Sequence, residues 1–382
     1  MKLFHLSDLH LGIRVCEHPL IEDQKHILTF ILKKVREQNP DAVMIAGDVY
    51  DRAVPSEEAV KLFDDFLCGL VDTGTTVLIT SGNHDSAERL GFGGRIMRRG
   101  NVYISPDFTK ENYADIIKPV TLKDEFGEVN FYMLPFVTPG SVRKANGAEI
   151  SDWSGAVGSV IKDMNVDTSA RSVLIAHQFV TGAERCDSET FSVGGADNVS
   201  AEVFSPFDYT ALGHLHGKQS VSRETVRYCG SPLKYSFSEV NHQKSITVLE
   251  LKEKGNVTIS EIPLNEPLHD WRVVNVGELG KLGYEELSAM RSDDYVEAVL
   301  SDEDYVLDAM NRLREFFPNI MKMRYDNAQT RKADSLSKSS ANLKGLAPLD
   351  VFDSFFKQQT GKELTEEQRA LVKEIFESEE EI

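Results

Sequence analysis

Seven side chains of metal-binding type stand at the ends of short apolar runs in this sequence. The clearest run, residues 43–46, leads into Gly47 and then into the carboxylate of Asp48. An uninterrupted apolar run predicts a strand buried on both faces of a sheet, with Asp48 at the end where α/β sheets bind ligands. Four further runs end in the same way, and in one sheet such ends converge at one rim. The candidate ligands are Asp8, His10, Asp48, Asn83, His177, His214 and His216.

These ligands are oxygen and imidazole donors, with no thiolate among them. Such a set suits Mn²⁺, Fe²⁺ or Zn²⁺ rather than Ca²⁺ or an iron–sulfur cluster. Seven ligands are too many for one tetrahedral ion, but they fit two ions about 3.5–4 Å apart that share one carboxylate. Because a carboxylate can bridge two metals, we take Asp48 as the candidate bridge. If these side chains had only structural roles, five predicted strands would each have to end in a metal-binding residue by coincidence. We therefore discard that interpretation.

The elements around these strand ends predict an α/β fold. Amphipathic helices are expected over residues 19–38 and from about residue 55 to Gly74, and they alternate with the first strands. Beyond Gly100 the strands become shorter and closer, which predicts a second sheet packed on the first and helices on the outside. The strands expected there are 129–137, 173–177, 209–213, 226–230 and 245–251.

The length of 382 residues predicts more than one domain. We expect the site domain over residues 1–265 and a small α+β accessory domain over 266–326. A Ser-, Lys- and Asn-rich linker is expected over 327–347. Residues 348–382 predict two short amphipathic helices, the second opened by a capping box at 365–368. Such helices on a tether cannot bury their apolar faces alone and need a partner.

The accessory domain is expected to alternate strands with helices. Its strands are predicted over 272–276, 295–300 and 321–325, and its helices over 284–290 and 304–317. It carries no cluster of candidate ligands.

Composition narrows the function and the location. No apolar run approaches the length of a membrane span, and the amino terminus enters a strand without a signal-peptide pattern. We therefore expect a cytoplasmic protein that does not bind a membrane. The four cysteines form no metal or disulfide framework. The net charge of −19 argues against strong unaided binding to nucleic acid.

Four arginines follow the turn at residues 82–85. Alone they are typical of a solvated helix face, but beside a metal site they predict a track for phosphates. These candidate substrate-binding residues are Arg89, Arg95, Arg98 and Arg99.

At this point the motifs resemble a known family. The motifs are Asp8-x-His10, Gly47-Asp48-x-x-Asp51, Gly82-Asn83-His84-Asp85, His177 and Gly213-His214-x-His216. Together they resemble the calcineurin-like metallophosphoesterases, whose fold is a two-sheet sandwich flanked by helices. Three further segments are similar to the nuclease subunits of bacterial SbcCD complexes: Asp8-Leu9-His10-Leu11-Gly12, Tyr228-Cys229-Gly230-Ser231-Pro232 with Phe237-Ser238-Glu239, and residues 355–362.

The resemblance implies a role for each matching residue. One Mn²⁺ would be held by Asp8, His10, Asp48 and His216, and the other by Asp48, Asn83, His177 and His214. Mg²⁺ or another divalent ion is the alternative. His84 would be the catalytic histidine beside the scissile phosphate, and Asp85 would orient it. Asp51 could stabilise its turn or support a metal ligand from behind, and we favour the first interpretation.

The resemblance also implies a biological role. The chain would be a DNA nuclease subunit, a 3′–5′ double-strand exonuclease and single-strand or hairpin endonuclease, in recombination, replication and repair at the nucleoid. Its accessory domain would cap the DNA. Its residues 348–382 would bind SbcC, an SMC-like coiled-coil ATPase, and it would form a homodimer within a heterotetramer. Candidate dimer contacts are Leu62, Phe66, Phe92 and Met97.

Two other functions stay open from the residues. The chain could be a docking scaffold for the ATPase with a structural metal site. It could also be a small-molecule cyclic-nucleotide phosphodiesterase with the same metal chemistry, against which the tethered helices and the accessory domain argue.

Overall fold

The computed structural model describes residues 1–189, 197–328 and 330–331, and in the tail residues 352, 356, 363–365, 368, 369 and 372. The chain divides into two compact units. The first comprises Met1–Val274, Arg291–Glu297 and Arg314–Lys322. The second comprises Asn275–Met290, Ala298–Leu313 and Met323–Ile382. Within the described residues, no helix has the length and apolarity that crossing a bilayer requires.

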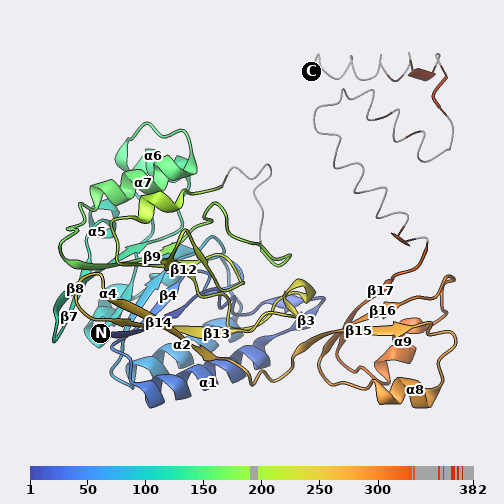
Figure 1. Ribbon diagram of the computed structural model, residues 1–382. Helices are drawn as coiled ribbons and strands as arrows, with labels where there is room; N and C mark the ends of the chain where they lie inside the picture. Colours follow the sequence, from blue (N-terminus) through green and yellow to red (C-terminus); the bar gives the residue numbers. More distant parts are fainter. Residues whose placement is uncertain are drawn as a thin grey trace. The chain divides into compact units, whose positions relative to one another are not determined.

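The first unit contains two six-stranded sheets (Figure 1). One has the strand order β14-β13-β1-β4-β5-β6, and β1, β4, β5 and β6 run parallel. Its strands are β1 (Lys2–Leu6), β4 (Ala42–Ala46), β5 (Thr76–Thr80), β6 (Val102–Ile104), β13 (Ser245–Leu251) and β14 (Val257–Pro263). The parallel strands therefore bring their carboxyl ends to one edge.

The place of β13 corrects one expectation. Residues 245–251 were expected in the second sheet, but β13 pairs antiparallel with β1, with His5 opposite Thr247. Apolar periodicity predicts that a segment is a strand, but it does not determine the strand's partner, which depends on the path of the whole chain.

The other sheet has the strand order β11-β12-β10-β9-β8-β7. Its four inner strands run parallel, and β7 and β11 close its edges antiparallel. The strands are β7 (Val120–Asp124), β8 (Gly127–Leu134), β9 (Arg171–His177), β10 (Tyr209–Gly213), β11 (Gln219–Val221) and β12 (Arg223–Tyr228). The central pair, β9 and β10, carries the predicted ligands of this sheet.

The two sheets face each other across a shared core. In β4, Met44 lies in a core cluster with Ile175 of β9, whereas Val43 and Ile45 lie in a cluster with Ile31 of α1 (Ile21–Gln38). This alternation is the period of two expected for a strand buried on both faces. The predicted sandwich is confirmed.

Helices cover the outer faces of the sandwich. Figure 1 shows α1 and α2 (Glu57–Val71) on one side and α6 (Pro139–Asn146) and α7 (Trp153–Asp163) on the other. Local capping explains their ends: the Ser56 side chain accepts from the backbone of Ala59 to open α2, and Asn39 ends α1 in a left-handed conformation. The remaining short elements of this unit are β2 (Arg14–Val15), β3 (His18–Pro19), α3 (Ala87–Leu90), α4 (Gly94–Met97), η1 (Arg98–Gly100), α5 (Tyr113–Ile116), η2 (Ala201–Phe204) and η3 (Phe237–Glu239).

Two of the candidate dimer contacts lie in the core. Leu62 and Phe66 are buried in the cluster that α1 and α2 share, so they are not available to a second copy. Phe92, by contrast, is 83% exposed. A helix pattern identifies an apolar face but not what that face covers.

A third sheet has the order β15-β16-β17, with strands β15 (Trp271–Gly277), β16 (Tyr295–Leu300) and β17 (Ile320–Tyr325). Its helices are α8 (Tyr284–Ala289) and α9 (Ala309–Arg314). The helix predicted over 304–317 is therefore shorter than expected. Asp308 has a φ of 56°, a left-handed conformation that an α-helix cannot contain, so α9 begins only after it.

The predicted linker and tail lie almost wholly outside the described residues, and the domain boundaries stay a prediction. Among the described tail residues, Thr365 and Gln368 exchange two hydrogen bonds, from the Thr365 N–H to the Gln368 side chain (3.0 Å) and from the Gln368 N–H to the Thr365 hydroxyl (3.3 Å). This pair is the capping box that the sequence predicts.

Candidate metal centre

The loops after β1 and β4 run side by side at the rim. The N–H of Asp8 donates to the Gly47 carbonyl (3.1 Å), and the N–H of His10 donates to the Asp48 carbonyl (3.0 Å). Asp8, His10 and Asp48 have φ values of 52°, 43° and 50°. Left-handed backbone at a residue other than glycine is uncommon and costs on the order of 1–3 kcal/mol. Such strain clusters at functional sites, because the fold must hold the side chains there in one orientation.

Two glycines make room for the ligands. A side chain at Gly47 would place its Cβ 2.4 Å from Nδ1 of His177, and one at Gly82 would place it 2.1 Å from Oδ1 of Asp48. Gly47 also has a φ of 83°. The backbone therefore packs directly against the predicted ligands, which only glycine permits.

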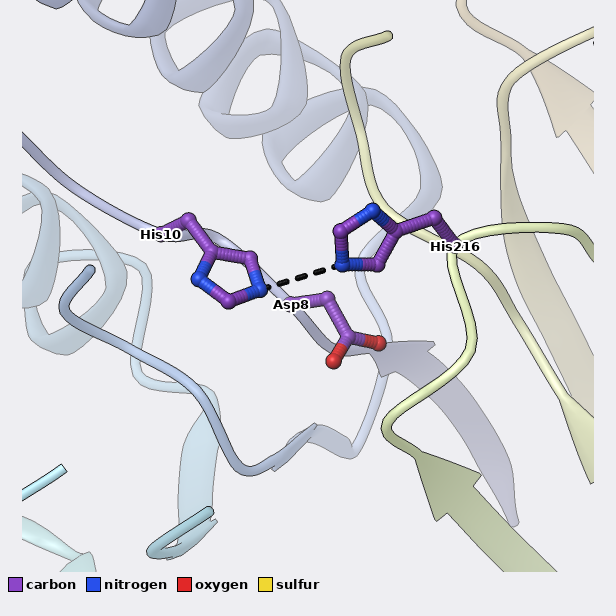
Figure 2. Close-up of side chains that lie close together, drawn as sticks. All are labelled: Asp8, His10 and His216. Carbon is purple, nitrogen blue, oxygen red and sulfur yellow. Dashed lines mark hydrogen bonds between the residues drawn. The ribbon is translucent and has the colours of Figure 1, made fainter. Parts of the chain in front are cut away.

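Asp8, His10 and His216 form one half of the site (Figure 2). Each offers one ligand atom, and these atoms all lie within 4.8 Å of one another. The two imidazoles approach through their Nε2 atoms, 3.1 Å apart. All three side chains are buried.

Asn83, His177 and His214 form the other half. Oδ1 of Asn83 lies 3.0 Å from Nε2 of His177 and 3.0 Å from Nδ1 of His214. Nδ1 of His177 donates to the carbonyl of Ala46 (2.9 Å). This bond keeps the proton on Nδ1 and leaves the Nε2 lone pair directed to the rim, as in imidazoles that bind metals.

Asp48 lies between the two halves. Its Oδ2 is 3.2 Å from Nε2 of His177 and 3.6 Å from Nε2 of His10. It also belongs to a third group of candidate ligands, with His10 and His84. The structure therefore brings all seven predicted ligands together, with the expected bridge in the middle; their roles as ligands stay a prediction.

The electrostatics of the rim favour a cation. Asp8 and Asp48 are buried, and within residues 1–189 and 197–328 only histidines lie within ion-pair distance of either carboxylate. Burial opposes protonation of His177, but Asp48 and Asp8 outweigh it and raise its pKa to about 9. Burial lowers the pKa of His214 to about 3. Carboxylates whose charge keeps a proton on His177, beside the neutral imidazole of His214, fit divalent metal ions, which displace such a proton when they bind.

A cysteine near the rim does not join the ligand set. Sγ of Cys229 lies 3.1 Å from the hydroxyl of Ser7, next to Asp8. Burial raises the pKa of this thiol far above its usual range, and within the described residues the thiol belongs to none of the groups of candidate ligand atoms. The donors at the rim are oxygen and imidazole nitrogen, as the sequence predicts.

His84 is held at the edge of the rim by a group that the sequence did not indicate. Its Nδ1 donates to the backbone carbonyl of Asp51 (2.8 Å), and its ring meets that of His10 edge to face at 4.8 Å. The carboxylate of Asp85 accepts three backbone N–H groups, from Val49, Tyr50 and Gly82. Asp85 thus braces the loops after β4 and β5 against each other. Its predicted role in orienting His84 stays a prediction.

The four arginines are all exposed. Arg89 donates to the carbonyl of Ala53 (2.8 Å), two residues from the Asp51 carbonyl that holds His84. Arg95, Arg98 and Arg99 make no side-chain hydrogen bond or ion pair within the described part of the chain. Only Arg89 is tied to the site by a described contact.

A polar group behind His216 was not predicted from the sequence. It is formed by the buried Glu189, Glu239 and Lys244 and the half-buried Ser188. The motif Phe237-Ser238-Glu239, which carries part of the resemblance, is the signal in the sequence that could have found it.

The fold and this site define a class of protein. The family model of the calcineurin-like phosphoesterases matches residues 1–218, and that of the type 5 capsule protein repressor C-terminal domain matches residues 267–360. The SbcD subunit of the nuclease SbcCD from Staphylococcus epidermidis is 30% identical over 381 residues, which are 98% of this chain and 98% of that protein. The chain belongs to the calcineurin-like phosphoesterases and, within them, to the family of SbcD nuclease subunits.

Solved structures are similar at lower identity. A dimetal phosphatase from Danio rerio is 12% identical, with a TM-score of 0.43, over 70% of this chain and 98% of that one. An archaeal phosphodiesterase is 14% identical, with a TM-score of 0.30, over 69% of this chain and 100% of that one. The family identifies the chain as a metal-dependent hydrolase of phosphate esters, and together with the cluster of Asp and His side chains it supports a site for two divalent metal ions.

Proposed function

We propose that this chain is the nuclease subunit of an SbcCD-type complex and that it hydrolyses phosphodiester bonds of DNA with two Mn²⁺ ions. The observation that carries the proposal is the convergence of seven oxygen and imidazole donors from both sheets at one buried rim. The full-length similarity to an SbcD nuclease subunit supports the choice of nucleic acid as substrate.

The proposed ligand sets follow the two halves of the rim. Asp8, His10, Asp48 and His216 hold one ion, and Asp48, Asn83, His177 and His214 hold the other. When bound, two divalent ions supply Lewis acidity toward the phosphoryl oxygens and a water acidic enough to attack at neutral pH.

The protein's own residues supply the rest of the chemistry. Because Nδ1 of His84 donates to the Asp51 carbonyl, the proton that His84 gives to the leaving oxygen comes from Nε2 of the imidazolium. Such general acid catalysis contributes about 10²–10⁴-fold. Asp85 keeps the His84 loop in place through the backbone groups that it accepts.

Charge limits which surfaces grip the DNA. Residues 266–326 contain fourteen Asp and Glu residues but only seven Lys and Arg residues, so this segment repels phosphates on balance. We infer that Arg89, and with it Arg95, Arg98 and Arg99, orients the strand at the site. The remaining affinity for duplex comes from the ATPase partner.

The finer activities are part of this proposal. They are 3′–5′ exonuclease action on duplex ends and endonuclease action on single strands and hairpins, at the nucleoid. Residues 348–382 bind the SMC-like ATPase, and the chain pairs with a second copy. The exposed Phe92 and the half-buried Met97 are the candidate contacts that remain for this pairing.

The test uses the purified chain with Mn²⁺ and linear duplex DNA. The wild type should degrade the duplex, and His84→Ala should stop cutting while it still binds Mn²⁺. His26→Ala, which removes an exposed histidine bonded to the Glu266 carbonyl, is the matched control and should cut normally.

Three outcomes would count against the proposal. Cutting by His84→Ala at the wild-type rate would remove His84 from its role. A wild type that is inert on DNA but forms a normal complex with the ATPase would favour the scaffold. Faster hydrolysis of cyclic nucleotides than of DNA would favour a small-molecule phosphodiesterase.

A further inference from the structure

A chain of hydrogen-bonded side chains, buried except for the half-buried Ser188, runs away from the metal centre behind His216. The Ser188 hydroxyl lies 2.8 Å from Nδ1 of His216 and donates to Oε1 of Glu239 (2.6 Å). Glu239, in η3, is fully buried, and His216 is 2% exposed. Three segments far apart in the sequence therefore meet at one ligand.

Lys244 holds the other oxygen of this carboxylate. Its ammonium donates to Oε2 of Glu239 (2.6 Å), to the backbone carbonyl of His216 (2.8 Å) and to the hydroxyl of Ser231 (2.8 Å). These three acceptors use all three protons of the ammonium. The Lys244–Glu239 pair is thus fixed to the backbone of His216 as well as to its side chain.

The hydrogen bonds have one direction. A hydroxyl has a single proton, and Ser188 gives it to the Glu239 carboxylate, which can only accept. Ser188 must therefore accept from His216, which places the imidazole proton on Nδ1. The Nε2 lone pair is then directed to the rim, where Nε2 of His10 lies 3.1 Å away.

The same tautomer is set more simply elsewhere in the site. At His177 a single backbone carbonyl, that of Ala46, accepts the Nδ1 proton. At His216 the buried Lys244–Glu239 ion pair takes the place of such a carbonyl. A buried ion pair is costly, because removing two charges from water offsets much of their attraction. What the ion pair adds is a strong, negatively charged acceptor that raises the basicity of the imidazole it serves.

We propose that Glu239 is a positioning residue of the metal centre: through Ser188, and held by Lys244, it fixes the Nδ1–H tautomer of His216 and directs Nε2 to the ion on that side. A second carboxylate holds the main chain of His216, because Oε1 of Glu189 accepts its backbone N–H (2.7 Å). Ser188 and Glu189 follow β9 in the chain, and these two residues hold the ligand through its ring and its backbone. The inference rests on the proposed two-metal centre.

The test measures Mn²⁺ binding, which is independent of turnover. Free Mn²⁺ is followed by electron paramagnetic resonance during titration of the full chain. The wild type should bind two ions. Glu239→Gln and Ser188→Ala should weaken one of the two by about 10–100-fold and leave the other within about threefold. Glu261→Gln makes the same carboxylate-to-amide change at a pair with Lys218 and Arg227, and it should bind both ions normally.

A second readout separates positioning from mere stability. Nitrogen NMR of ¹⁵N-histidine in the metal-free chain should show the His216 proton on Nδ1 in the wild type and a mixture of tautomers in Ser188→Ala. Ser188→Ala leaves the Glu239–Lys244 pair in place, so it carries the test if Glu239→Gln fails to fold.

The outcomes distinguish this inference from the proposed function. A wild type that binds fewer than two ions would overturn the metal centre and this inference together. A wild type that binds two ions, with Ser188→Ala binding both at wild-type affinity, would overturn the positioning role alone. So would a metal-free wild type whose His216 carries its proton on Nε2.

Discussion

The substitution Gly82→Ala tests how closely the backbone supports the site. A Cβ at Gly82 would lie 2.1 Å from Oδ1 of Asp48 and 2.5 Å from its backbone N. Ordinary contacts begin near 3.4 Å, so the two groups must separate by about 1.3 Å. These two atoms of Asp48 cannot move aside, because Asp48 is buried and its Oδ1 also accepts the backbone N–H of His84 (2.9 Å).

The size of the effect follows from this displacement. Overpacking of a buried site costs about 1–3 kcal/mol of folding free energy. A misplacement of about 1 Å near the reacting groups costs about 10²-fold in rate. That factor corresponds to about 2.7 kcal/mol of transition-state stabilisation. We expect Gly82→Ala to fold, to melt a few degrees lower, and to lose about 10²-fold in turnover.

The assay is the hydrolysis of bis(p-nitrophenyl) phosphate with Mn²⁺, together with Mn²⁺ titration and thermal unfolding. Gly158→Ala is the matched control: it lies in α7, its Cβ would lie 3.6 Å from Val203, and it should leave turnover unchanged. Gly82→Ala with wild-type turnover and wild-type Mn²⁺ affinity would refute the reasoning.

Three further predictions concern stability. Mn²⁺ at 100 times its dissociation constant should raise the free energy of unfolding by about 2.7 kcal/mol, and a chelator should reverse this; a melting temperature insensitive to Mn²⁺ would contradict it. Asp124→Asn should cost about 1.5–3 kcal/mol in urea at pH 7, because it weakens the charged bonds from the buried Arg171. Arg171 holds the pKa of Asp124 well below its usual value of 3.8. The pair's contribution to the free energy of unfolding is therefore complete above pH 3.8 and is lost progressively as the pH falls below 3.8. A deficit that stays constant from pH 7 to pH 3 would contradict this assignment. Tyr295→Phe should cost about 1 kcal/mol through the lost bond to Asp23 (2.7 Å) without changing DNA cutting; a loss of cutting would show a role that the structure does not explain.

The parts of the fold that could be predicted are those governed by local pattern. Strand β4 was predicted because its buried residues leave no polar interruption, and α2 because Ser56 caps a periodic helix. The pairing of β13 with β1 and the late start of α9 at Ala309 could not be predicted. The first depends on contacts more than two hundred residues apart, and the second on the left-handed backbone of Asp308.

The site divides in the same way. Asp48 and His177 were predicted because a strand end presents its side chain to a known edge. The carbonyl of Asp51 that holds His84, and the hydroxyl of Ser188 that holds His216, carry no signal in residue type. Any residue offers a backbone carbonyl, and a serine in a long connection is common. Only the folded chain brings these groups to the ligands they orient.

The central claim is tested most directly by a crystal soaked in Mn²⁺ and measured at the manganese absorption edge. We predict two anomalous peaks about 3.5–4 Å apart, with Asp48 between them. Asp8, His10 and His216 should surround one peak, and Asn83, His177 and His214 the other. A single peak, or peaks that none of these side chains touches, would contradict the two-metal centre.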